Sequence, residues 1–210
     1  MEQGAVADPG GGLRERKKQA TRRALHDAAL RLVLEHGLEG LTVEEISAAA
    51  DVSPRTFFNY FPGKEQAIIG DDLFVADPEK ITTIMMDAAS VLDGLRDVAL
   101  ALATQTLTRR EQVLMRWQVM ERYPALITRM FARFEEFDKV LASAVAARTG
   151  ASADDAYPRL MAAVTTATIR VAVRRWTAEH GDLPLEHYVS ETFGLLRGEL
   201  SDGRVRGGNS

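Results

Sequence analysis

Four neighbouring residues, Arg55, Thr56, Phe58 and Asn59, have side chains suited to reading the edges of base pairs. The guanidinium of Arg55 can donate two parallel hydrogen bonds to guanine, and the amide of Asn59 can pair with adenine. A methyl group or an aromatic ring, as in Thr56 and Phe58, can contact the methyl group of thymine. These residue types together indicate recognition of base pairs in the major groove. The alternative interpretation is that Arg55 and Asn59 are solvated polar residues on a small helix.

Local capping signals predict two short helices that would position these side chains. Thr42 and Glu45 have the spacing of a capping box, so we expect a helix over residues 43–50. Ser53 can cap a following helix that has proline at its first position, which predicts a helix over residues 54–61. The two helices and the tight turn between them form a candidate helix-turn-helix.

The spacing of apolar residues indicates which side of the second short helix faces outward. At 100° per residue, Phe57 and Phe61 lie on one face, which we expect to pack against the neighbouring helices. Arg55 and Asn59 then lie on the opposite face, with Thr56 and Phe58 on the flanks.

A basic cluster precedes this segment, around the start of a helix that apolar periodicity predicts over residues 16–36. Positive charge at a helix N-terminus opposes the macrodipole, so helix stability does not explain the cluster. Contact with DNA phosphates, or an arm in the minor groove, explains it better than a solvated run of charges. The cluster consists of Arg14, Arg16, Lys17, Lys18, Arg22 and Arg23.

The run LTVEEISAAADVSPRTFFNYFPGKE, residues 41–65, resembles the DNA-binding signature of the TetR family of bacterial transcriptional regulators. The resemblance extends over about residues 20–70. It implies an N-terminal three-helix domain that binds double-stranded operator DNA. It also implies a larger, variable helical domain that binds a small molecule and forms a homodimer.

The resemblance also implies roles for single residues. Thr56 and Phe58 would lie on the recognition helix, Tyr60 would contact a phosphate, and Lys64 would bind the DNA backbone. Phe58 stands where the family often has Tyr, so it would contact a base or sugar without a hydroxyl group. Asp51 stands in the turn where Gly is common, which is tolerable because Asp adopts left-handed conformations more readily than most residues. The candidate DNA contacts are Arg14, Arg16, Lys17, Lys18, Thr42, Ser53, Pro54, Arg55, Thr56, Phe58, Asn59, Tyr60 and Lys64.

Helical periodicity continues through the rest of the chain and predicts an all-α protein of about nine or ten helices. After the first three, we expect helices over residues 64–74, 79–88, 92–107, 109–122, 124–148, 154–179 and 184–200. We expect a disordered tail over 1–12, a helix-turn-helix domain over 13–62, an effector-binding and dimerisation domain over 63–202, and a second disordered tail over 203–210.

Two sets of residues in the larger domain are candidates for binding. An aromatic and methionine-rich group, with two arginines that suit a carboxylate or phosphate, is the candidate effector pocket, although such residues are often plain core or an exposed stripe. Its members are Met115, Trp117, Met120, Phe131, Phe134, Met161, Arg170 and Arg174. The candidate dimer interface on the last two helices is Val164, Ile169, Val171, Val173, Tyr188, Phe193, Leu195 and Leu196; a monomer would use all of these as core.

Composition and motifs argue against other classes of protein. The chain of 210 residues has no cysteine and a net charge of −4, which fit a cytoplasmic protein with one basic face. No apolar run approaches the roughly 20 residues of a membrane span. No catalytic or cofactor-binding motif occurs, and no pair among His26, His36, His180 and His187 has metal-ligand spacing, so we expect neither cofactor nor metal and place these histidines at the surface or at helix ends. Two alternatives remain: a helical ligand-binding or interaction module without DNA binding, and an all-α enzyme that uses the larger domain.

Overall fold

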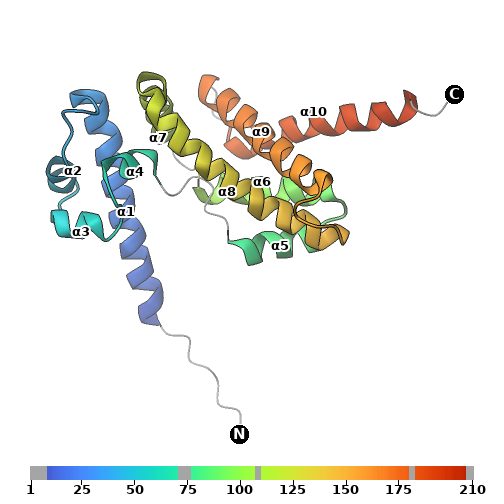
Figure 1. The fold of residues 1–210 in the computed structure, drawn as a ribbon, viewed down its shortest axis with the longest axis horizontal. Coiled ribbons are helices and arrows are strands. Elements are labelled where there is room, and N and C mark those ends of the chain that lie inside the picture. Colours follow the sequence, from blue (N-terminus) through green and yellow to red (C-terminus); the bar gives the residue numbers. More distant parts are fainter. Residues whose placement is uncertain (1–8, 71–76, 107–109, 180–182, 207–210) are drawn as a thin grey trace, which may run out of the picture. The chain divides into compact units, whose positions relative to one another are not determined.

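The computed structural model describes residues 9–70, 77–106, 110–179 and 183–206, and all regular structure in these ranges is helical (Figure 1). This confirms the all-α prediction. The helices are α1 Pro9–His36, α2 Val43–Ala49, α3 Pro54–Phe58, α4 Lys64–Ile69, α5 Pro78–Asp87, α6 Val91–Thr106, α7 Arg110–Arg122, α8 Pro124–Thr149, α9 Ala156–Ala178 and α10 Leu185–Arg206.

The ends of the chain are more helical than predicted. α1 begins at Pro9, seven residues before the predicted start, and proline suits the first position of a helix because its missing N–H would have no helical partner there. α10 continues to Arg206, into the segment expected to be a tail. Residues 1–8 and 207–210, the remainder of the two predicted tails, lie outside the described residues.

The helices α3 and α4 are shorter than predicted. After Phe58 the chain continues in tighter turns, because the N–H of Asn59 bonds to Thr56 O and that of Tyr60 to Phe57 O, three residues back. α4 ends at Gly70, whose φ of +76° is outside the helical range. Residues 71–76, where the predicted helix would have continued, lie outside the described residues.

The chain divides into two compact units. Unit 1 consists of residues 1–70 and 115–126, and unit 2 of residues 71–114 and 127–210. α7 is therefore shared, since its first residues group with unit 2 and its remainder with unit 1. Part of unit 1, which contains the helix-turn-helix, thus comes from a segment that the sequence places in the larger domain.

In unit 1, α1 packs against α2 and α4, and α2 packs against α3. Apolar side chains on all four helices, together with Phe61 in the turn after α3, form the core, as the periodicity of the sequence predicts. The fully buried members include Leu25, Leu30, Val33, Ile46, Phe57, Phe61 and Ile68. This packing fixes α3 with one aromatic face inward.

In unit 2, α5 packs on α6, and α9 and α10 pack on each other and on α6. The end of α5 is held by Arg148, at the end of α8, whose guanidinium donates to the carbonyl oxygens of Met85, Met86 and Ala88 at 2.6, 3.2 and 2.7 Å. The last carbonyl groups of a helix have no hydrogen-bond donor within the helix, and Arg148 provides donors for those at the end of α5.

Over the described residues, no helix combines the length and apolar character needed to cross a membrane. The same residues contain no group of three or more His, Asp or Glu side chains placed to hold a metal ion.

Candidate nucleic-acid interface

A closed capping box fixes the start of α2. The hydroxyl of Thr42 accepts a hydrogen bond from the N–H of Glu45 at 3.2 Å. In return, the N–H and the hydroxyl of Thr42 both donate to Oε2 of Glu45, at 2.8 and 2.9 Å. The bond from the Thr42 backbone, followed by that from its side chain, holds the pKa of the Glu45 carboxyl below its ordinary value.

The turn and the start of α3 are fixed in the same local way. Asp51 has a φ of +54° and is the only non-glycine residue with positive φ in the described ranges, which confirms the left-handed turn expected there. Ser53 caps α3: its Oγ accepts from the N–H of Thr56 at 3.1 Å and lies 2.9 Å from the Thr56 hydroxyl.

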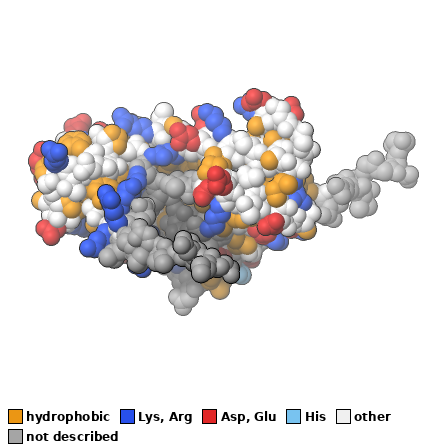
Figure 2. Space-filling view, turned by 90° about the horizontal axis from the view of Figure 1, so that it is seen from below, with side chains coloured by type: hydrophobic (Ala, Val, Ile, Leu, Met, Phe, Trp, Pro, Cys, Tyr) orange, Lys and Arg blue, Asp and Glu red, His pale blue; other side chains and the backbone are white. Residues whose placement is uncertain are grey.

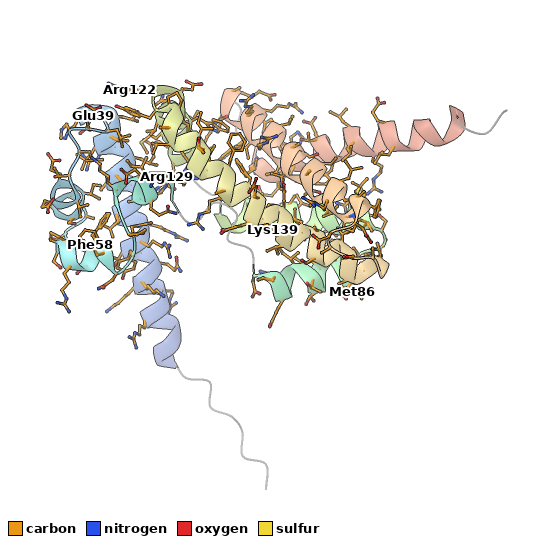
Figure 3. The ribbon with its side chains drawn as sticks, in the orientation of Figure 1. Glu39, Phe58, Met86, Arg122, Arg129 and Lys139 are labelled. Carbon is orange, nitrogen blue, oxygen red and sulfur yellow. The ribbon has the colours of Figure 1, made fainter. Side chains whose placement is uncertain are left out.

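These caps leave one face of α3 outward. Phe57 is fully buried, whereas the ring of neighbouring Phe58 is 57% exposed and meets Phe57 edge to face at a centroid distance of 5.4 Å (Figure 3). Arg55 and Asn59 are exposed, and their side chains make no hydrogen bond or ion pair within the described part of the chain. The helix α3 therefore presents a guanidinium and an amide that make no bond within the described fold, together with the exposed part of an aromatic ring.

The basic cluster lies along the N-terminal part of α1. Arg14, Arg16, Lys17 and Lys18 are exposed, and Figure 2, which views unit 1 from the N-terminal end of α1, shows Lys and Arg side chains on this side. Arg22 differs, because it is half-buried with its guanidinium 5.3 Å from the centre of the Phe61 ring. The exposed members thus form a positive surface, while Arg22 packs on the core.

In addition to Ser53 and Thr56, two predicted DNA contacts, Thr42 and Lys64, have their polar atoms engaged within the fold. The N–H and the hydroxyl of Thr42 are bonded to Glu45 in the capping box. The ammonium of Lys64 donates to the carbonyl oxygens of Leu38 and Leu41, both at 2.8 Å, in the loop between α1 and α2. Tyr60 is half-buried, beyond the end of α3.

His26 corrects the sequence-based expectation that the histidines lie at the surface or at helix ends. It is 3% exposed, its Nδ1 lies 2.6 Å from Ala67 O of α4, and its Nε2 lies 2.6 Å from a guanidinium nitrogen of Arg116. A carbonyl only accepts and a guanidinium only donates, so the ring is neutral with its proton on Nδ1. His36 and His187 are exposed, and His180 lies outside the described residues.

Arg116 belongs to a set of α7 contacts that the sequence did not reveal. Beyond it, Arg122, which Figure 3 labels, donates to Leu34 O at 3.2 Å. The hydroxyl of Tyr123, the residue after α7, accepts from the N–H of Leu38 at 3.1 Å. These bonds join residues about 90 positions apart, so no local spacing could have indicated them. They attach the last part of α7 to the end of α1 within unit 1.

The predicted effector residues are divided between the two units. Met115, Trp117 and Met120 belong to unit 1, and the other five belong to unit 2. Of the latter, Phe131, Arg170 and Arg174 are exposed, and the Arg170 guanidinium lies 5.9 Å from the centre of the buried Phe134 ring. A cavity of about 580 Å³ does occur in unit 2 between α8 and α9, but it is lined by charged and small side chains, and none of the predicted residues is among them.

The structure corrects half of the predicted dimer interface. Ile169, Val173, Tyr188 and Phe193 are buried inside unit 2, so they form protomer core and are out of reach of a second copy. Val164 and Leu196 are half-buried. Val171 of α9 and Leu195 of α10 are 47% and 67% exposed. Helical periodicity marked these residues as apolar but could not say which face meets the core.

Comparisons with known proteins agree with this architecture. A family model described as "Bacterial regulatory proteins, tetR family" matches residues 25–67, and one described as "MftR C-terminal domain" matches residues 89–201. The chain is 36% identical over 180 residues to the HTH-type transcriptional regulator TcmR of Streptomyces glaucescens, covering 80% of this chain and 77% of TcmR.

Solved structures show the same fold. The Thermus thermophilus repressor FadR in complex with lauroyl-CoA aligns with a TM-score of 0.52 at 23% identity, covering 83% of this chain and 92% of that one. The Bacillus subtilis regulator FadR in complex with stearoyl-CoA aligns with a TM-score of 0.55 at 19% identity, covering 83% and 96%.

Proposed function

Because the chain belongs to the TetR family of bacterial transcriptional regulators, we propose that it is a homodimeric repressor that binds a palindromic operator and is released by a small molecule. The observation that carries this proposal is the outward face of α3, where Arg55, Phe58 and Asn59 are exposed on a helix held by its own cap. The exposed side chains of Arg55 and Asn59 and the exposed part of the Phe58 ring are available to base pairs.

Direct reading of the operator would fall to these side chains. The guanidinium of Arg55 suits guanine, the amide of Asn59 suits adenine, and the ring of Phe58 supplies apolar contact with a base or sugar. Ser53, Pro54, Thr56 and Tyr60 surround them and would complete the contact region. Phosphate contacts would come from the exposed Arg14, Arg16, Lys17 and Lys18.

The spacing of half-sites in a palindromic operator favours a dimer. Two recognition helices can enter successive major grooves only when their centres are about 34–36 Å apart, so two copies must be joined at a fixed spacing. We place the contact on α9 and α10, where Val171 and Leu195 remain exposed in the single chain. An exposed Gly194 next to Leu195, with open space around it, would allow close approach of a partner helix.

Release by an effector would act through α7. This helix begins in unit 2, and its last part holds α1 through Arg116, Arg122 and Tyr123 in unit 1. A small molecule that bound one position of α7 better than another would change DNA affinity, and DNA would change effector affinity by the same factor. Acyl-CoA thioesters are the first compounds to screen, because two structures of this fold hold them.

The proposal is tested by selecting duplexes from a random pool with the purified protein and titrating the selected duplex at several salt concentrations. We expect a palindromic sequence and a slope of log affinity against log salt of roughly −7, as four phosphate contacts from each of the two copies would give. No enrichment at low salt would overturn the proposal and favour a ligand-binding module without DNA binding.

Arg55→Ala then tests base reading. Loss of a bidentate contact should cost roughly 1–3 kcal/mol and relax the preference at one position of each half-site. Arg159→Ala, which removes an exposed arginine of unit 2, is the matched control and should change neither affinity nor preference. An equal loss on every duplex with Arg55→Ala would contradict its role in reading bases.

A further inference from the structure

Lys64 is the first residue of α4, at a helix end where its charge opposes the macrodipole. Its charge is therefore not there to stabilise α4. The side chain is half-buried, in contrast to the exposed Lys17 and Lys18 of α1. Lysine side chains ordinarily extend into water, so the position of its ammonium needs a structural explanation.

The contacts of Lys64 supply that explanation. Its Nζ donates to Leu38 O and Leu41 O, each at 2.8 Å, and these carbonyls belong to the loop that leads from α1 to the capping residue Thr42. Loop carbonyls have no partners from regular structure, and hydrogen bonds from a charged donor are among the stronger ones. The side chain of Leu41 is 1% exposed, so the end of this loop is fixed in the core as well.

We propose that Lys64 is a positioning residue of the DNA interface, which holds the loop between α1 and α2 and thereby fixes where α2 and α3 begin, instead of neutralising a phosphate. This inference rests on the proposed DNA binding. It departs from the role that family resemblance implies for this position. Two of the three ammonium protons are already donated to carbonyls before any DNA is present.

The two roles predict different responses to DNA. A lysine that binds a phosphate is reactive in the free protein and becomes protected when the duplex binds. A lysine engaged by the loop reacts slowly in both states. A phosphate contact also contributes to the salt dependence of binding, whereas a positioning contact affects how well the correct sequence is distinguished from others.

The first experiment is lysine footprinting of the wild-type dimer by brief acetylation and mass spectrometry, with and without a saturating amount of the duplex selected from the random pool. We expect Lys17 and Lys18 to lose reactivity on the duplex, and Lys64 to react slowly and equally in both states. Lys80 and Lys139, exposed in unit 2, should react rapidly in both states and serve as controls.

The second experiment compares Lys64→Met with Lys17→Met. Lys17→Met removes one phosphate contact from each copy of the dimer, so it should lower the salt slope by about 1.8 and weaken the selected and an unrelated duplex alike. Lys64→Met should leave the salt slope unchanged and weaken the selected duplex about tenfold, as loss of a charged hydrogen bond would give, with little effect on the unrelated duplex.

The outcomes separate this inference from the proposed function. Protection of Lys64 by the duplex together with Lys17, or a lower salt slope for Lys64→Met, would overturn the positioning role while leaving DNA binding intact. No protection of any lysine and no bound duplex would overturn DNA binding itself. The footprint uses the wild-type protein, so it decides the question even if Lys64→Met fails to fold.

Discussion

Two helix caps, one in each unit, differ in the contacts that surround them. At the start of α2, Thr42 and Glu45 bond to each other, and of the remaining charged groups only the exposed His36 lies nearby, 3.9 Å from Glu45. At the start of α6, Ser90 and Asp93 bond at 2.6 and 3.1 Å, but Asp93 also pairs with Arg197 of α10.

The same contrast applies more widely. The caps of α2 and α3 come from residues within three positions, whereas two helix ends of unit 2 are also bound by arginines from distant helices, with Arg148 at the end of α5 and Arg197 at the start of α6. The first turns of α2 and α3 thus have caps from their own sequence, and Lys64 also holds the loop before α2. In unit 2, these two helix ends contact helices that are distant in the sequence.

The largest expected effect tests the distant arginines. Arg148→Met removes three hydrogen bonds to carbonyls at the end of α5 and should lower the free energy of unfolding by about 3 kcal/mol, given the strength of hydrogen bonds from charged groups. Urea denaturation measures the loss. Arg159→Met, at an exposed position of the same unit, should change stability by less than about 0.5 kcal/mol.

Ser53→Ala tests a local cap and should have a smaller effect. Loss of an N-cap side chain typically costs about 1 kcal/mol, and here it frees the N–H of Thr56. Ser143→Ala, on the exposed face of α8, controls for loss of a hydroxyl. If Ser53→Ala lowered the free energy of unfolding as much as Arg148→Met, local caps would not be weaker than hydrogen bonds from distant arginines.

Asp51→Gly should stabilise the protein slightly. Asp51 occupies the left-handed region, which costs an L-residue energy that glycine does not incur, while glycine loses more entropy on folding. The net gain should be about 0.5 kcal/mol, measured as a higher denaturation midpoint. A destabilised variant would show that the Asp51 side chain contributes more than its backbone strain costs.

The smallest expected effect is the pH dependence of the stability that these two caps contribute. The pKa of Glu45 is lowered by its bonds from Thr42, and that of Asp93 is lowered first by Ser90 and then by Arg197. A lowered folded-state pKa gives stability that is present above the ordinary pKa and lost as pH falls through the lowered one. Glu45→Gln and Asp93→Asn should each reduce the fall in stability below about pH 4.5, with no change in that fall for Lys80→Met.

This difference also explains what could be predicted from the sequence. The caps at Thr42 and Ser53 and the left-handed turn at Asp51 depend on residues three or fewer positions apart, so their spacing is visible in the chain. The His26–Arg116 contact and the bonds of Lys64 depend on how helices meet, and no spacing encodes them.

The candidate binding residues of unit 2 were harder to predict for a related reason. Val173 and Leu195 are both apolar residues on amphipathic helices, yet one is buried and the other 67% exposed. A helix that packs on two sides has apolar residues around most of its surface, so the period alone does not separate core from interface. The side chains on α3 could be sorted because Phe57 and Phe61 identify its inner face.

The division of α7 between the two units bears on the engineering of chimeric regulators. A graft that transferred only residues 1–70 onto a foreign sensor would omit residues 115–126, which group with the same unit. His26 would lose its partner Arg116, and the end of α1 would lose Arg122 and Tyr123. The transplantable DNA-binding part of this protein therefore comprises two separate stretches of chain, and a fusion point after Gly70 must carry the last part of α7 with it.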